Sequence, residues 1–392
     1  MKKTIAVIFG GRSAEHDVSI ITAHTPIIQS LLATGQFDIW PIYIAKDGSW
    51  YSDQTMNDLA YFKQDNFRAH LAKQKKVQIL FDNGLKIIWP GIRSKTIQVD
   101  IAFPAMHGTF GEDGSLMGLL RMAGIPFVGC DLFASAVAMD KVLTKQVLAA
   151  ENIPVVPHVW FTKSNWEIDR SIWTEKIAKL KWPVFVKPVH LGSSIGITKV
   201  KQNSELENAI EVAFHYDDKV LVEEIVENLI EVTLPIMGNE ELQLAAIERP
   251  LNKTEFFDFS DKYLSGNKKG GGANSQYSEI PANIDKELAE QVEDLGKRTY
   301  RTLGCSGIAR IDFLIDGSSK RVFVNEVNTL PGSLYHHNWK KVGVSGVELV
   351  AKLIALAEER FASQVHCEYL LEFRCTDYLH HHLFYFPRDT YH

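Results

Sequence analysis

The chain has 392 residues, of which 45% are hydrophobic and 23% are charged, and its formal net charge is −6. This length predicts more than one domain, and the composition is typical of globular proteins with sizeable cores. The negative charge argues against non-specific nucleic-acid binding. The four cysteines show no CxxC spacing, which fits a reducing compartment with no disulfide framework. No apolar stretch is long enough to cross a bilayer. We therefore expect a cytoplasmic protein with neither a nucleic-acid nor a membrane partner.

The first part of the chain predicts a parallel sheet covered by helices on both faces. Strands are expected over residues 4–9, 37–44, 101–104 and 125–128, and helices over 13–32 and 114–123. In such sheets, functional groups collect at the carboxyl ends of the strands. Glu15 and His107 both follow strand ends, so we expect them to face one crevice.

Two further α/β regions follow. A helix carrying Lys141 is expected over 135–150, and strands over 158–161, 184–187, 196–199, 220–224, 230–236, 243–248, 305–315 and 321–327. Further helices are expected over 286–303 and 347–361. The predicted domains are residues 1–134, 135–220 and 221–363, followed by an atypical tail over 364–392 that is rich in Tyr, Phe and His.

Oxygen-bearing side chains mark the last two predicted strands. Asp312, Glu326 and Asn328 supply the hard oxygen ligands that suit Mg²⁺, and such sites commonly also hold nucleotide phosphates. Arg310 would then lie beside the phosphates that it could neutralise. The alternative is a pair of ordinary strands with a solvated edge, and the pattern alone leaves the two interpretations equal.

Several segments could bind phosphate. Lys187 is the last residue of a predicted strand, and Lys141 lies on a predicted helix. A lysine can bind phosphate as a point charge. For either lysine alone, however, an ordinary surface position is the favoured interpretation. In the segment 192–196, glycines beside Ser193 and Ser194 would let backbone N–H groups approach phosphates. This segment lacks the Walker A spacing, and a plain hairpin turn is the alternative.

Two more segments allow either a structural or a functional interpretation. The polar, glycine-rich run 106–114 either caps a helix or places His107 near a substrate. Lys262 and Tyr263, just before the glycine-rich run 268–275, lie either on an ordinary strand or on a lid over the reacting centre.

Together and in this order, the segments resemble the D-alanine–D-alanine ligases of the ATP-grasp superfamily. The resemblance spans residues 3–361 and is carried by segments 15–19, 107–114, 139–141, 186–188, 192–194, 262–263, 310–312 and 325–332. It implies three α/β domains, an N-terminal pre-ATP-grasp domain and an ATP-grasp pair that clamps ATP. It also implies a homodimeric ligase that joins two D-alanines through D-alanyl phosphate for peptidoglycan precursor synthesis.

The resemblance also implies residue roles. ATP would be contacted by Lys141, Lys187, Ser193, Ser194, Glu223, Glu224, Ile225 and Glu231. Asp312, Glu326 and Asn328 would bind a pair of Mg²⁺ ions, which Mn²⁺ could replace. Glu15 would fix the ammonium of the first D-alanine, with Val18 and His107 beside it.

The same resemblance also implies which residues stabilise the oxyanion, form the lid and bind the second substrate. Arg310 and the Gly332 N–H would stabilise the tetrahedral oxyanion. Ser193 and Tyr263, hydrogen-bonded with Glu15, would order the site, and Lys262 would approach the second substrate's carboxylate or the phosphate. Ser333 and Leu334 are interpreted as the family's serine–leucine pair for the second carboxylate, with a few residues missing before it; a gap-free count would put His337 and Asn338 there.

Because the loop at Ser333 and Leu334 differs from the family pattern, the identity of the second substrate is not determined. It could be D-alanine, D-lactate, D-serine or another amino acid, and Tyr263 favours an amine nucleophile. A D-alanine–D-X ligase is therefore the alternative function, and a non-catalytic nucleotide-binding protein is a third. The combination of Glu15, Arg310 and the metal ligands argues against the third.

Overall fold

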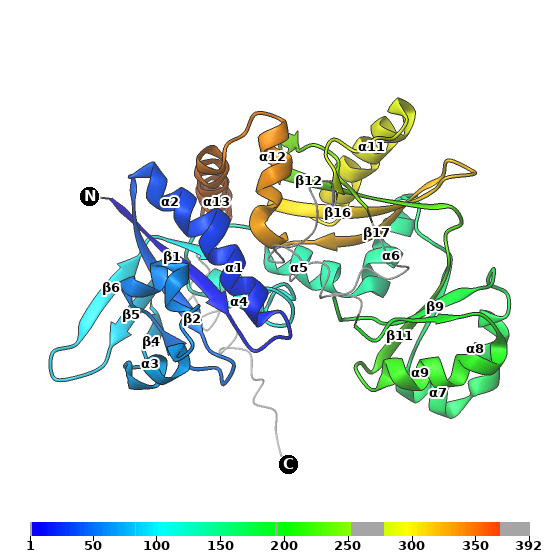
Figure 1. Ribbon diagram of the computed structural model, residues 1–392, viewed down its shortest axis with the longest axis horizontal. Helices are drawn as coiled ribbons and strands as arrows, with labels where there is room; N and C mark the ends of the chain where they lie inside the picture. The colour runs from blue at the N-terminus through cyan, green and yellow to red at the C-terminus, as the bar shows by residue number, and fades with distance from the viewer. Residues whose placement is uncertain (1, 83, 193–194, 252–277, 369–392) are drawn as a thin grey trace, which may run out of the picture.

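The computed structural model describes residues 2–82, 84–192, 195–251 and 278–368, and Figure 1 shows three groups of strands and helices along the chain. In the first group, β1 lies between β2 and β7 and is parallel to both, and β3 pairs antiparallel to β2. Residues 5–9 of β1 are fully buried, as expected for a strand with helices on both faces. The strand bounds are β1 Lys3–Gly10, β2 Phe37–Ile44, β3 Trp50–Tyr51 and β7 Ile101–Pro104.

The chain segment between β3 and β7 forms a small antiparallel sheet that was not predicted from the sequence. It has the order β4-β5-β6, with bounds Gln78–Phe81, Leu85–Trp89 and Lys95–Val99. The helical segments of this group are α1 His16–Thr22, η1 Ala23–Ile28, α2 Gln29–Thr34, η2 Gln54–Asn57, η3 Leu59–Tyr61, α3 Phe67–Lys73 and α4 Ser115–Met122. The predicted strand over 125–128 is reduced to a single bridge between Phe127 and Ala102.

The predicted helix over 13–32 is divided into α1, η1 and α2, and η1 is a π-helix. Pro26 lies inside it. A proline has no N–H to donate to the carbonyl four residues earlier, here that of Thr22, and its ring clashes with that carbonyl in a regular α-helix. The wider π turn accommodates the proline within one continuous helical segment.

The second group is an antiparallel sheet in the order β10-β9-β11-β8. Its strands are β8 His158–Thr162, β9 Val184–Pro188, β10 Thr198–Val200 and β11 Lys219–Glu224, and its helices are α7 Lys163–Ile168, α8 Arg170–Ile177, η4 Asn203–Glu205 and α9 Leu206–Phe214. The apolar sides of these helices and the sheet form one core, which contains Phe161, Trp166 and Ile210.

The helix predicted over 135–150 is wrong as a single helix. It is broken into α5 Leu132–Met139 and α6 Lys141–Ala150. At the break, Asp140 has an extended backbone, and its Oδ1 accepts hydrogen bonds from the N–H groups of Val142 at 2.8 Å and Leu143 at 2.9 Å. Aspartate is a preferred N-cap because its carboxylate satisfies these orphan donors. Lys141 is therefore the first residue of a helix.

The third group is an antiparallel sheet in the order β13-β12-β16-β17, covered on one face by α11. The bounds are β12 Leu229–Gly238, β13 Leu242–Leu244, β16 Gly307–Asp316, β17 Val322–Asn328 and α11 Lys286–Thr302, with a small pair β14 Arg249–Pro250 and β15 Ser278–Glu279 beside it. The strand predicted over 243–248 is shorter than expected. β13 ends at Leu244, after which Ala245 donates one backbone hydrogen bond to the Pro235 carbonyl and Glu248 forms an isolated bridge with Thr233.

The last described helix returns to the first sheet. After η6 Gly332–Tyr335 and α12 His336–Lys341, α13 Gly346–Glu368 lies beside α2 (Figure 1). Leu349 and Leu353 of α13 share one hydrophobic core with Ile5 and Phe9 of β1. Among the described residues, no helix is both long and apolar enough to cross a membrane.

Ser19 joins the carboxyl ends of the neighbouring strands β1 and β7, and removing its hydroxyl tests this junction. Its fully buried Oγ accepts the Gly10 N–H and donates to the Ala105 carbonyl, both at 2.7 Å. Ser19→Ala leaves two buried backbone groups unpaired, so we expect the free energy of unfolding to fall by about 2–4 kcal/mol in urea titrations. The matched Ser204→Ala, at an exposed position, should change it by less than about 0.5 kcal/mol. Equal effects would contradict this role of Ser19.

Candidate active site

The strand register of the third sheet gathers four polar side chains on one face. Arg310 pairs with Asn328, and Asp312 pairs with Glu326. Because alternate residues of a strand share a face, all four side chains lie on the same side. The intervening residues Ile311 and Val327 enter the core on the α11 side. A bulge follows Asp312, and such bulges redirect side chains at a strand end.

Arg310 and Asp312 form a bidentate ion pair. The Arg310 Nε donates to Asp312 Oδ1 at 2.6 Å, and Nη2 donates to Oδ2 at 2.5 Å. Asn328 Nδ2 donates to the same Oδ2 at 3.3 Å, and Glu326 Oε1 lies 3.9 Å from Arg310 Nη2. Burial has the largest single effect and opposes the charge of Arg310, but Asp312, Tyr335 and Glu326 together outweigh it and raise the pKa of the guanidinium well above its usual value. The face therefore carries a fixed positive charge beside the carboxylates.

The same face offers a donor set for a hard cation. Two carboxylates and an amide oxygen, from Asp312, Glu326 and Asn328, are the ligand types that Mg²⁺ prefers. All three side chains are half-buried, so an ion between them would keep open positions for water or phosphate. The residues present thus fit a magnesium site.

A buried ion-pair cluster lies in the second group. Glu223, which is 1% exposed, pairs with Lys187, and its Oε2 lies 3.1 Å from Lys145 Nζ. Burial alone would raise the pKa of this carboxyl, but the ammonium groups of Lys145 and Lys187 outweigh it and lower the pKa to about 2. Glu223 thereby fixes Lys187 at the end of β9. Lys145, four residues after Lys141, was missed from the sequence, although this spacing places both lysines on one side of a helix.

Lys141 connects this cluster with the polar face of the third sheet. Its Nζ donates to the Leu191 carbonyl at 2.7 Å, just before the segment that carries Ser193. Burial lowers the pKa of the Lys141 ammonium, and the negative charge of Glu326 partly offsets that effect. The structure thus brings a lysine of α6 near a carboxylate of β17.

The residues predicted for the first substrate lie at the carboxyl ends of β1 and β7. The Glu15 carboxylate is close to two glycines, because a Cβ on Gly108 would lie 3.1 Å from its Oε2 and a Cβ on Gly192 would lie 3.8 Å from its Oε1. His107 is buried, and its Nε2 lies 2.8 Å from Thr22 Oγ1. Val18 is also buried, on α1. Ser193, Ser194, Lys262 and Tyr263 lie outside the described residues.

The segment after β17 has an unusual backbone. Ser333, Leu334 and Tyr335 have φ angles of 51°, 50° and 49°, in the left-handed region that residues other than glycine rarely adopt. Gly332 begins this turn. Leu334 is buried in the first core, and the Ser333 N–H donates to Thr22 Oγ1 at 3.1 Å. The turn therefore joins the third sheet to α1.

Tyr335 is a candidate site residue that the sequence analysis did not assign. The left-handed turn brings its ring to 5.0 Å from the Arg310 guanidinium, a cation–π contact. Burial raises the pKa of the Tyr335 hydroxyl to about 12 even though Arg310 opposes the shift. The ring thus covers the arginine that also binds Asp312. The sequence signal was only an aromatic residue beside a predicted loop.

The other predicted residues are placed as follows. Glu224 Oε1 accepts the Lys181 N–H at 2.8 Å, and Ile225 follows β11. Glu231 is on β12 and lines a pocket of ≈ 240 Å³. His337 Nε2 lies 3.1 Å from Glu248 Oε2, and the fully buried Asn338 donates to the Ala246 carbonyl at 2.9 Å.

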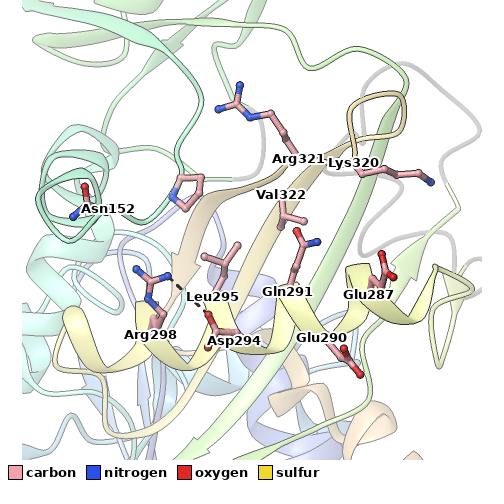
Figure 2. A pocket seen from close by; sticks show the side chains of 11 residues that line it. Asn152, Glu287, Glu290, Gln291, Asp294, Leu295, Arg298, Lys320, Arg321 and Val322 are labelled. Atoms are coloured by element: carbon pink, nitrogen blue, oxygen red, sulfur yellow. Dashed lines mark ion pairs between the residues drawn. The ribbon is translucent and has the colours of Figure 1, made fainter.

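A second groove lies elsewhere. It has a volume of ≈ 680 Å³, and Figure 2 shows side chains of α11 and the start of β17 around it. An ion pair between Arg298 and Asp294 crosses part of its wall (Figure 2). Its lining includes Leu295, which packs on the core face of the third sheet, so the groove lies away from the polar face. None of the predicted site residues is among the described residues that line it.

Solved ligase structures share this arrangement of sheets and helices, so the predicted α/β fold class of an ATP-grasp enzyme is confirmed. Family models described as "D-ala D-ala ligase N-terminus" and "D-ala D-ala ligase C-terminus" match residues 4–130 and 147–355. The chain therefore belongs to the D-alanine–D-alanine ligase family, a family of ATP-dependent ligases, and the resemblance predicted from its motifs is confirmed.

Individual relatives agree. The chain is 36% identical over 357 residues to a D-alanine–D-alanine ligase of Thermosipho africanus, with 91% of this chain and 94% of the relative covered. It is 37% identical over 370 residues to that of Natranaerobius thermophilus, covering 92% and 96%. Among solved structures, it is similar to the VanG D-Ala:D-Ser ligase from Enterococcus faecalis, with a TM-score of 0.76, 34% identity and coverage of 91% and 100%. It is also similar to the D-alanine–D-alanine ligase from Coxiella burnetii, with a TM-score of 0.77 and 29% identity, covering 94% of this chain and 98% of that one.

The buried cluster around Glu223 predicts a large stability loss on neutralisation. Glu223→Gln keeps the shape but removes the charge partner of Lys145, which is 1% exposed. We expect the free energy of unfolding to fall by about 3–5 kcal/mol, because one charge is left buried without compensation. Urea titration would measure it, with Glu224→Gln as the matched control, since an amide oxygen can still accept the Lys181 N–H. A loss no larger than that of the control would refute the ion pair's role.

His190 predicts a pH dependence on the alkaline side. Its Nε2 lies 3.3 Å from Asp140 and its Nδ1 lies 3.0 Å from Asp217, and these carboxylates raise the pKa of the imidazole from 6.5 to about 9. The folded-state pKa exceeds the unfolded value, so the stabilisation is complete below pH 6.5 and is lost as the pH rises through 9.

Wild-type stability should therefore decline between these pH values more steeply than that of His190→Gln, as measured by urea unfolding across the range. His70→Gln, at an exposed position, is the matched control and should follow the wild type. Parallel curves for wild type and His190→Gln would count against this assignment.

Proposed function

We propose that the protein is an ATP- and Mg²⁺-dependent ligase that joins two D-alanines through a D-alanyl phosphate, for peptidoglycan precursor synthesis. The observation that carries the proposal is the convergence of three elements. The Arg310–Asp312–Glu326–Asn328 face of the third sheet lies near Lys141, and the Ser333 segment reaches α1, which Glu15 precedes. Family membership supports the same activity.

In this proposal, ATP binds between the predicted domains 135–220 and 221–363. Lys141 and Lys187 contact its phosphates, and Ser193 and Ser194 fold over the terminal one. Glu224 and Ile225 line the adenine pocket with Glu223, whose carboxylate also holds Lys187, and Glu231 is nearest the ribose hydroxyls.

Asp312, Glu326 and Asn328 would hold a pair of Mg²⁺ ions, or Mn²⁺ in their place. A metal bound there neutralises phosphate charge as a Lewis acid. The fixed charge of Arg310 lies on the same face, so positive charge is already oriented toward the phosphate before reaction.

The first D-alanine would bind through its ammonium to Glu15, beside Val18 and His107. Its carboxylate attacks the γ-phosphorus of ATP, which forms D-alanyl phosphate and releases ADP. The amine of the second D-alanine then attacks the acyl carbon, loses a proton and expels phosphate.

The same residues would serve the second step. Arg310 and the Gly332 N–H stabilise the oxyanion of the tetrahedral intermediate. Ser333 and Leu334 hold the second carboxylate, while Lys262 and Tyr263 close over the site with Ser193. A homodimer, a cytoplasmic location, a first domain over residues 1–134 and a separate tail over 364–392 complete the proposal.

Phosphate release from ATP, with products identified by mass, tests the proposal. With Mg²⁺ and D-alanine alone, we expect the dipeptide, and Glu326→Gln should reduce turnover by more than roughly 100-fold because a metal ligand is lost. Glu290→Gln, on the exposed side of α11, is the matched control and should keep wild-type turnover.

If phosphate release rises only when D-serine, D-lactate or another acceptor is added, that acceptor is the second substrate. Such a result would favour the D-alanine–D-X alternative. Unchanged turnover in Glu326→Gln would refute the metal site.

A further inference from the structure

Thr22 lies where the two substrate regions of the proposed ligase meet. It is the last residue of α1 and is 2% exposed. Pro26 cannot donate to the Thr22 carbonyl, and the α-helix passes into a π-helix directly after Thr22. The Thr22 hydroxyl is therefore presented at the junction between the α-helix and the π-helix.

The Thr22 hydroxyl contacts two distant segments. Its Oγ1 lies 2.8 Å from the Nε2 of His107, in the loop after β7. It also accepts the N–H of Ser333, in the loop after β17, at 3.1 Å. His107 is proposed for the first D-alanine and Ser333 for the second. One buried oxygen thus bridges both substrate sites.

The contact with Thr22 holds the His107 ring by its Nε2. Because the Ser333 N–H can only donate, Thr22 Oγ1 accepts it, and the same hydroxyl can still donate to His107 Nε2 or accept a hydrogen from it. The contact therefore holds the ring in either tautomer. On the other side of the ring, His107 Nδ1 lies 3.8 Å from Glu112 Oε1, and Glu112 Oε2 accepts the Gly108 N–H at 2.7 Å.

The second contact anchors a strained turn. Ser333 has a φ of 51° and begins a run of three non-glycine residues in the left-handed region. Such a conformation persists only where surrounding contacts hold it. The bond from the Ser333 N–H to Thr22 is such a contact, and Leu334 in the first core is another.

We propose that Thr22 is a positioning residue that keeps the first-substrate histidine and the second-substrate loop in register. The inference rests on the proposed ligase function. It assigns Thr22 no contact with substrate: the hydroxyl acts through His107 and through the backbone at Ser333. Both D-alanine sites therefore depend on the same oxygen, whereas ATP binding does not.

Three variants separate the hydroxyl from the packing of the side chain. Thr22→Val keeps the shape and removes the hydroxyl, and Thr22→Ser keeps the hydroxyl. Thr34→Val is the matched control, because the Thr34 hydroxyl also accepts one backbone N–H, from Gln36 at 3.1 Å, and donates to one carbonyl, that of Leu31 at 2.7 Å. It lies at the end of α2.

Steady-state kinetics of dipeptide formation give the readout. In Thr22→Val, we expect the KM values for both D-alanines to rise on the order of tenfold, the loss that follows when a buried N–H loses its acceptor. The KM for ATP should stay at the wild-type value. Thr22→Ser and Thr34→Val should keep all three KM values.

The outcomes are distinct. A lower kcat with unchanged KM values, or Thr22→Ser as impaired as Thr22→Val, would overturn the proposal, because either result indicates a packing role. If Thr22→Val does not fold, Thr22→Ala allows the same comparison with Thr22→Ser. A wild type that makes no dipeptide would refute the proposed function itself, whereas an active wild type with an unaffected Thr22→Val would refute only this inference.

Discussion

The candidate site depends above all on the register between β16 and β17. Pairing Asp312 with Glu326 turns both carboxylates to one face and sends Ile311 and Val327 to the other. A slip of one residue would exchange the two faces, burying the carboxylates and exposing the apolar residues. Each buried side chain of this kind contributes about 1.5–3 kcal/mol to holding the correct register. The apolar face against α11 therefore determines where the polar groups lie.

The candidate site also depends on ion pairs that form within the protein itself. Glu223 holds Lys145 and Lys187, and Asp312 holds Arg310, so these three cations already have a fixed partner. An unpaired buried cation would be expensive, whereas a paired one can remain near a developing negative charge without reorganisation. The same pairs that stabilise the fold thus also orient the charges of the site.

The parts of the fold that rest on strong local patterns could be predicted from the sequence. β2 and β7 have the predicted bounds, because their apolar runs are continuous, and the alternation of Arg310 with Asp312 already indicated one shared face. The helix break at Asp140 was missed, because apolar periodicity continues through it and only the cap reveals it. Thr22 and Tyr335 could not be predicted, since their partners lie far away in the sequence.

The return of α13 to the first sheet has a consequence for synthesis on the ribosome. Leu349 and Leu353 complete the core that begins with Ile5, so the N-terminal sheet emerges long before the helix that covers it. At the usual rates of translation, the roughly 250 residues between Phe103 and Leu349 take about 10–50 s to be made. During that interval, the apolar surface that α13 later covers is open to solvent. We therefore expect a nascent chain of this protein to be prone to aggregation until its last described helix, α13, has emerged.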